Sequence, residues 1–193
     1  MRYDLTDMGL EQRHEQKWIN AVHEAGHALG ARLAGSEITE ATIVPTAKYN
    51  GQVRSMTIGW KQKIIENLLG HAAELEFGYQ EKYGHRSDDD EAEKLIKDFI
   101  KYERSEALSI PHFEWDVKPR YTYRDGKYVN LVQEWRNKVR VKKSEWKPRF
   151  DSYRRKARRL AKKHHAYIEK VALLLVEKGT LTNAEIPQLD RTQ

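Results

Sequence analysis

Apolar residues recur every three or four positions over long stretches of this chain, which is the spacing of one face of an α-helix. The pattern covers Glu11–Leu33 and Lys61–Glu76. It returns from about Asp88 to Ala107 and again over Phe150–Lys178, where the helix is basic at first and apolar later. Because strand-like patterns cover only short parts of the sequence, we expect a mainly α fold.

Two glycines interrupt the first predicted helix. Gly26 and Gly30 lie well inside Glu11–Leu33, and each glycine weakens a helix by about 1 kcal/mol relative to alanine. We therefore expect the backbone of another element to pack closely against this helix. Gly35 is the predicted stop of the helix.

Apolar and polar residues alternate between the first two helices, as they do in strands. The predicted strands are Glu37–Val44 and Gln52–Ile58, and Asn50-Gly51 favours a tight hairpin turn between them. Pro45 ends the first strand or marks it as an edge strand. We expect a small antiparallel β element, with Ile38–Val44 as an exposed edge to which an extended substrate adds as a strand.

The chain has 193 residues, a length typical of one domain. We expect residues 1–193 to form a single domain with an atypical insertion at about Pro111–Pro148. Within the insertion, a short hairpin is predicted around Tyr121–Val129 and a helix around Leu131–Val139. Near the end of the chain, Leu181–Ile186 is expected to form a short helical turn.

The composition restricts both the chemistry and the location of the protein. The chain has no cysteine, which excludes disulfides, thiolate zinc sites and cysteine nucleophiles, so any metal must be held by His, Asp or Glu. The longest purely apolar run, Val171–Val176, is far shorter than the roughly 20 residues that span a bilayer, and no signal peptide is evident. We expect a cytoplasmic protein that does not insert into a membrane.

The sequence His23-Glu24-Ala25-Gly26-His27 is an HExxH motif in the middle of the first predicted helix. Residues four apart lie on the same helix face, so His23 and His27 can bind one ion, and neutral imidazoles suit Zn²⁺. Glu24 is rotated by about 100° from His23 and can act as a general base toward a zinc-activated water. The motif predicts a zinc metalloendopeptidase, which hydrolyses peptide bonds.

A catalytic zinc site has three protein ligands and one open position. The residues alone leave two kinds of third ligand open. One is a glutamate of the second helix, Glu66 or Glu74. The other is the acidic start of the third helix, Asp88–Asp90. Glu74 and Glu76 are interpreted as solvated helix positions, with orientation of the zinc histidines as the alternative.

The residues around the motif resemble a known family. Ala21–Leu29, with the sequence AVHEAGHAL, looks like the zinc helix of the peptidase domain of FtsH-type AAA proteases. Gly70–Leu75 is similar to the second helix of that domain, although the usual pair of glycines is Gly70-His71 here. Ile43-Val44-Pro45 resembles the family's strand that ends in proline beside the active site.

The same resemblance selects one aspartate. In that family an alanine follows the aspartate ligand by four residues, and apolar residues follow it by seven and eight. Counted from Asp88, these positions hold Ala92, Leu95 and Ile96. The resemblance therefore assigns His23, His27 and Asp88 to the metal and Glu24 to catalysis, with Asp89 as the runner-up ligand.

The resemblance also implies a substrate and a limit on activity. Ile43, Val44 and Pro45 are the implied substrate-binding residues. The sequence contains no Gly-x-x-x-x-Gly-Lys-Ser/Thr phosphate loop, so we expect this chain to lack the AAA module of that family. We therefore expect ATP-independent cleavage of unfolded or flexible protein segments, or of substrates that a separate unfoldase delivers.

A basic segment supports an alternative function. Lys147–Lys163 contains nine Lys or Arg residues and only one acidic residue, Asp151, in a chain of net charge +6. Such a segment is most often a solvated helix face, but it can also bind nucleic acid or an acidic protein partner. The alternative to the enzyme is a zinc-containing binding module that uses this basic helical surface.

Overall fold

The fold is mainly α with a small antiparallel sheet, as predicted. The computed structural model describes residues 10–47, 50–57, 59–79, 86–109, 121–124 and 127–189. No helix in these ranges is long and apolar enough to cross a membrane. The described helices are α1 (Leu10–Leu33), α2 (Trp60–Glu76), α3 (Arg86–Ala107), α4 (Leu131–Lys138), α5 (Lys143–Lys163) and α6 (His165–Lys178).

The chain divides into two compact units. One unit comprises residues 1–92 and 151–193, and the other comprises residues 93–150. Both α3 and α5 contribute residues to each unit. The expectation of a single domain with an insertion at 111–148 stays a prediction, and residues 110–120 and 125–126 lie outside the described residues.

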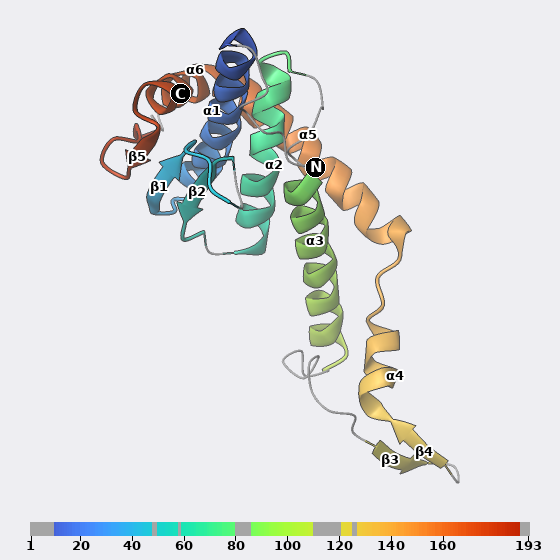
Figure 1. Ribbon diagram of the computed structural model, residues 1–193. Coiled ribbons are helices and arrows are strands. Elements are labelled where there is room, and N and C mark those ends of the chain that lie inside the picture. The colour runs from blue at the N-terminus through green and yellow to red at the C-terminus, as the bar shows by residue number, and fades with distance from the viewer. Residues whose placement is uncertain are drawn as a thin grey trace. The chain divides into compact units, whose positions relative to one another are not determined.

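In the first unit, α1 packs against both α2 and α6 (Figure 1). A Cβ atom at Gly26 would lie 2.3 Å from the backbone oxygen of Leu69, and one at Gly30 would lie 2.6 Å from the Cα atom of Glu66. The predicted close approach of another backbone is therefore confirmed, and α2 supplies it. Gly35, at a φ of 71°, follows the last turn of α1.

The sheet of this unit has the strand order β2-β1-β5 and is antiparallel throughout. Its strands are β1 (Ile38–Thr42), β2 (Gln52–Ser55) and β5 (Thr180–Thr182). The expectation that Ile38–Val44 forms an exposed edge is wrong, because β1 is the central strand. The predicted helical turn at Leu181–Ile186 is wrong at its start, because Leu181 pairs with Ala41 and is buried.

The basic C-terminal helix is two helices. His164 separates α5 from α6, with φ −110° and ψ 28°. The ring of His165 stacks on that of Phe77 at a centroid distance of 4.2 Å. The continuous helix predicted over Phe150–Lys178 is thus interrupted near its middle, and Gly179 ends α6 by donating its N–H to the oxygen of Leu175.

The second unit contains a two-stranded antiparallel sheet, formed by β3 (Tyr121–Arg124) and β4 (Lys127–Asn130), followed by α4. These elements match the predicted hairpin and helix closely. Where α3 and α5 run through this unit, Arg149 pairs with Glu103 at 2.8 Å, and the Lys97 ammonium lies 4.8 Å from the ring centre of Trp146. The ring of Trp146 therefore contacts another residue of the same unit.

Candidate metal centre

Two histidines of α1 point their outer ring nitrogens at each other. His23 and His27 lie one helical turn apart, so their side chains share a face. Their Nε2 atoms are 2.9 Å apart, and the two rings meet edge to face. Both side chains are only 13% exposed.

The first turn of α3 brings a carboxylate to this pair. Asp88 Oδ2 lies 3.1 Å from Nε2 of His23 and 3.5 Å from Nε2 of His27. One ligand atom from each of the three residues therefore falls within 4.8 Å of the others, and the group could hold a metal ion. Asp89, the runner-up in the sequence, is not part of this group.

The inner ring nitrogens of both histidines are held by oxygens of α2. Nδ1 of His23 lies 2.7 Å from Oε1 of Glu74, and Nδ1 of His27 lies 2.8 Å from the backbone oxygen of Glu66. A carbonyl oxygen can only accept a hydrogen bond, so His27 donates from Nδ1, and an ionised Glu74 requires the same of His23. In the neutral rings, the lone pair of each Nε2 atom then faces the other Nε2 atom and the carboxylate of Asp88.

Such an arrangement of acceptors requires positive charge between them. Burial works to lower the pKa of His23, but hydrogen bonds with Asp88 and Glu74 outweigh it and raise the pKa well above the usual value. Burial works to raise the pKa of Asp88, but the two histidines outweigh it and the pKa is lowered. The cluster could therefore hold a cation between these atoms, either a proton or a metal ion.

Neither glutamate that the sequence offered as a ligand belongs to the group. The carboxylate of Glu66 accepts hydrogen bonds from Ser55, Thr57 and Lys63 instead. Glu74 is 8% exposed and contacts Nδ1 of His23 rather than Nε2. The interpretation of Glu74 as a solvated position is therefore wrong, because it orients His23 as the alternative interpretation proposed.

Glu24 lies beside the group but not in it. Its side chain is buried, at 6% exposed, and Oε2 has no hydrogen-bond partner among the described residues. Burial raises the pKa of this carboxyl, and the neighbouring histidines oppose the rise. A raised pKa makes the carboxylate a better proton acceptor near neutral pH.

Two glycines bring backbone directly against these side chains. A Cβ atom at Gly70 of α2 would lie 2.6 Å from Nε2 of His27 and 2.8 Å from Nε2 of His23. A Cβ atom at Gly51, immediately before β2, would lie 2.6 Å from Oε1 of Glu24. The altered Gly70-His71 pair therefore keeps a glycine at the position that faces the histidines, and Gly51 lies directly against Glu24.

The start of α3 is anchored by a residue of α5 that the sequence placed in the basic surface. The guanidinium of Arg154 lies 3.7 Å from Asp89 and 3.3 Å from Nδ1 of His71. His71 is buried, at 3% exposed. Because Asp89 follows Asp88 directly, this contact restrains the turn that carries Asp88. Only the periodicity of α5, which turns Arg154 inward with Ala157, could have indicated this role.

The implied substrate-binding residues follow β1. Ile43 is 5% exposed, and its backbone N–H already donates a hydrogen bond to the backbone oxygen of Gly179. Val44 is 53% exposed, and Pro45 is also exposed. Binding of substrate by Ile43, Val44 and Pro45 stays a prediction. Of the three side chains, only those of Val44 and Pro45 are accessible.

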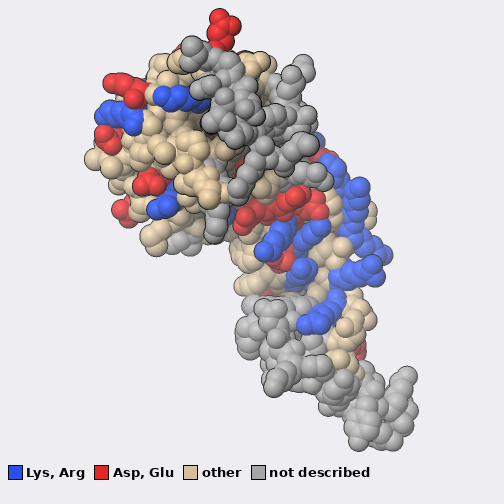
Figure 2. Space-filling view, in the orientation of Figure 1, with Lys and Arg blue, Asp and Glu red and all other residues tan. Residues whose placement is uncertain are grey.

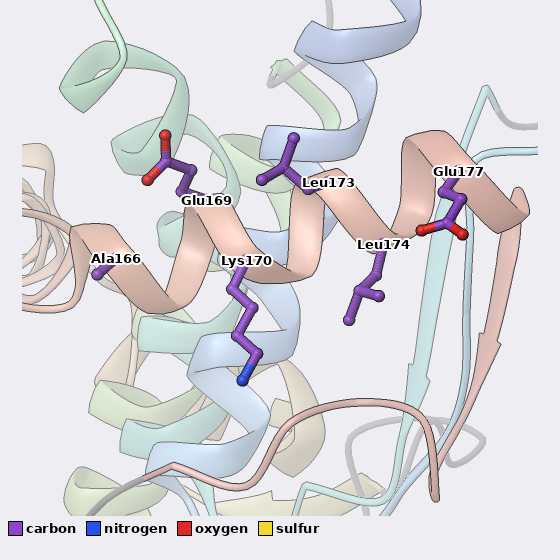
Figure 3. A pocket seen from close by; sticks show the side chains of 6 residues that line it. All are labelled: Ala166, Glu169, Lys170, Leu173, Leu174 and Glu177. Carbon is purple, nitrogen blue, oxygen red and sulfur yellow. The ribbon is translucent and has the colours of Figure 1, made fainter.

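A separate hollow lies on α6 (Figure 3). Lys170 and Leu174 point to one side of the helix, whereas Glu169 and Leu173 point to the other. All of its lining residues come from this one helix. The hollow includes none of the metal-site residues.

Replacing Glu74 by glutamine is expected to weaken metal binding about 10- to 100-fold, the usual effect of removing a carboxylate that orients a histidine ligand. Competition against a chromophoric chelator measures the affinity. Glu76→Gln is the matched control, since Glu76 lies 3.3 Å from His165 instead. Equal affinities for the two variants would show that Glu74 does not orient His23.

No protein-family model matches this chain, and a comparison with curated proteins found no match.

Proposed function

We propose that the protein is a zinc metallopeptidase that cleaves unfolded or flexible polypeptide segments without ATP. The observation that carries the proposal is the buried carboxylate of Glu24, with one oxygen unpaired among the described residues, beside the convergent atoms of His23, His27 and Asp88. A structural metal site needs no such carboxylate. The resemblance of Ala21–Leu29 and of the following segments to FtsH-type peptidase domains supports the same activity.

The spacing of the three ligand atoms suits zinc. Four ligands at 2.0–2.1 Å from a tetrahedral zinc ion lie about 3.3 Å apart. The separations between the two Nε2 atoms and Asp88 Oδ2 are 2.9, 3.1 and 3.5 Å. Two imidazoles and a carboxylate are also a donor set that zinc accepts, and they leave a fourth position for solvent or substrate.

The proposed mechanism assigns proton transfer to Glu24. When bound, zinc supplies Lewis-acid activation of water and polarises the scissile carbonyl. Glu24 accepts one proton from the attacking water and returns it to the nitrogen of the leaving amine, so that the peptide bond breaks with no net change in the enzyme. Glu74 and the backbone of Glu66 hold the two imidazoles in the required orientation throughout.

An extended substrate is proposed to add to β2 rather than to β1. No described strand pairs with the outer edge of β2, and exposed strand edges bind extended peptides through backbone hydrogen bonds. Gly51, directly before β2, lies against Glu24. A peptide on this edge would therefore pass close to the general base, with Val44 and Pro45 exposed at the other end of the loop.

The test is cleavage of reduced, unfolded casein by the zinc-loaded protein in the absence of ATP. We expect fragments on a gel and by mass spectrometry, loss of cleavage after treatment with 1,10-phenanthroline, and recovery when zinc is returned. ATP should have no effect on the rate. A fully zinc-loaded protein that leaves casein and shorter unfolded peptides intact would overturn the proposal.

A further inference from the structure

The outer face of α5 is covered by cations. Within residues 155–163, six Lys and Arg side chains are exposed, and none forms an ion pair with an acidic residue in the described part of the chain. Figure 2 shows blue side chains gathered over the surface that α5 forms in Figure 1. The six residues are Arg155, Lys156, Arg158, Arg159, Lys162 and Lys163.

The structure separates this set, hereafter the cationic face, from the other basic residues of α5. Arg154 turns inward to Asp89 and His71, and Arg149 pairs with Glu103. At about 100° per residue, the cationic face spans about 160° of the helix circumference. The buried residues Ala157 and Ala161 lie on the opposite side. The predicted basic surface Lys147–Lys163 thus narrows to residues 155–163.

Like charges on this face repel one another. Arg155 and Arg159, Arg158 and Lys162, and Arg159 and Lys163 are each four residues apart, a spacing at which equal charges destabilise a helix. No acidic residue occurs between Asp151 and Glu169 to offset the repulsion. A bound polyanion would relieve it by placing negative charge between the side chains.

We propose that the cationic face binds double-stranded DNA by lying in the major groove and contacting phosphates on both of its walls. The major groove of B-form DNA is about 12 Å wide and admits an α-helix of about 10–12 Å diameter. Phosphates flank that groove on both sides, which matches cations spread over a wide arc. A single row of carboxylates on an acidic protein would match a much narrower stripe. The deep major groove of A-form RNA is too narrow for such a helix.

The contacts of this face are expected to be largely independent of DNA sequence. Lys and Arg on both flanks meet phosphates, which position a protein without reading bases. The cationic face spans about 12 Å along the helix axis, at 1.5 Å per residue.

DNA binding by the cationic face goes beyond the proposed peptidase activity and does not depend on it, because Glu24 and the metal ligands contribute nothing to this surface.

The test measures binding of the full chain to a fluorescently labelled 20-base-pair duplex by anisotropy at several salt concentrations. The triple variant Lys156→Gln/Arg158→Gln/Lys163→Gln removes three charges from the two flanks of the face. The matched control, Lys94→Gln/Lys143→Gln/Lys170→Gln, removes three exposed charges elsewhere. Circular dichroism and thermal unfolding of both variants check that the fold is intact. Removing one side chain that binds a phosphate lowers the slope of log affinity against log salt by about one.

We expect the first triple variant to bind at least tenfold more weakly, with a salt slope smaller by about three, and the control to stay within about twofold of the wild type. The variant Glu24→Gln should bind DNA like the wild type even if no peptidase activity exists. Equal weakening in both triple variants would overturn the proposal, since net charge alone would explain it. So would the absence of wild-type binding at 50 mM salt, or tighter binding of poly-glutamate than of DNA, which would assign the face to an acidic protein.

Discussion

Replacing Glu24 by glutamine is expected to lower cleavage of unfolded casein by about 10²- to 10⁴-fold, the range that a positioned general base contributes. The amide has the size of the carboxylate but cannot accept the proton of the attacking water. Metal content should be unchanged, because the atoms that could hold a metal ion belong to His23, His27 and Asp88. The measurements are initial cleavage rates and zinc per protein after dialysis.

The matched control for this experiment is Glu15→Gln, which makes the same change at an exposed position of α1. It should keep both activity and metal. Burying a neutral amide costs less than burying a carboxylate, so Glu24→Gln is not expected to lower thermal stability. A Glu24→Gln protein that cleaves as fast as the wild type would refute the proposed mechanism, whereas one that no longer binds metal would assign Glu24 to the binding site itself.

Replacing Asp88 by alanine is expected to weaken metal binding by more than about 100-fold. The change removes one of three convergent ligand atoms, a larger effect than the 10- to 100-fold typical of a residue that only orients a ligand. Apparent affinity for zinc, from competition with a chelator of known affinity, is the measurement. In the metal-free protein, the same change also removes the acceptor that lies 3.1 Å from Nε2 of His23.

Asp89→Ala is the control that distinguishes the neighbouring aspartates. Asp89 lies 3.7 Å from Arg154 and outside the metal group, so its removal should weaken binding by no more than about tenfold, through a looser start of α3. The opposite order of effects, with Asp89→Ala the weaker binder, would mean that α3 presents its other carboxylate to the metal. Unchanged binding in both variants would exclude a ligand from this turn.

Much of the fold was predictable because its signals are local. Helix periodicity within 60–76 and 86–107, the stop at Gly35 and the two-stranded hairpin before α4 each depend on residues close in sequence. Gly26 and Gly30 even indicated a close neighbour, though not its identity. The break at His164 was missed, because its residues continue an acceptable helical pattern and nothing local requires an interruption.

The strand arrangement was less predictable because strand pairing is not local. Thr180–Thr182 is too short to show a period, and it becomes β5 only because β1 lies alongside it, about 140 residues earlier in the chain. That pairing places β1 in the centre of the sheet and leaves β2 as an edge. A proline after Val44 was compatible with an edge strand, but it could not exclude a partner from the C-terminus.

The sequence by itself determined the pairing of His23 with His27 and the position of Glu24 beside them, because a helix places residues four apart on one face whatever surrounds it. The resemblance ranked Asp88 above Asp89, but only the tertiary structure brought Asp88 to the histidines, assigned Glu74 to His23 and turned Arg154 away from the cationic face. Each of these contacts joins residues more than 50 positions apart. Such contacts depend on how α1, α2, α3 and α5 pack, which no local pattern encodes.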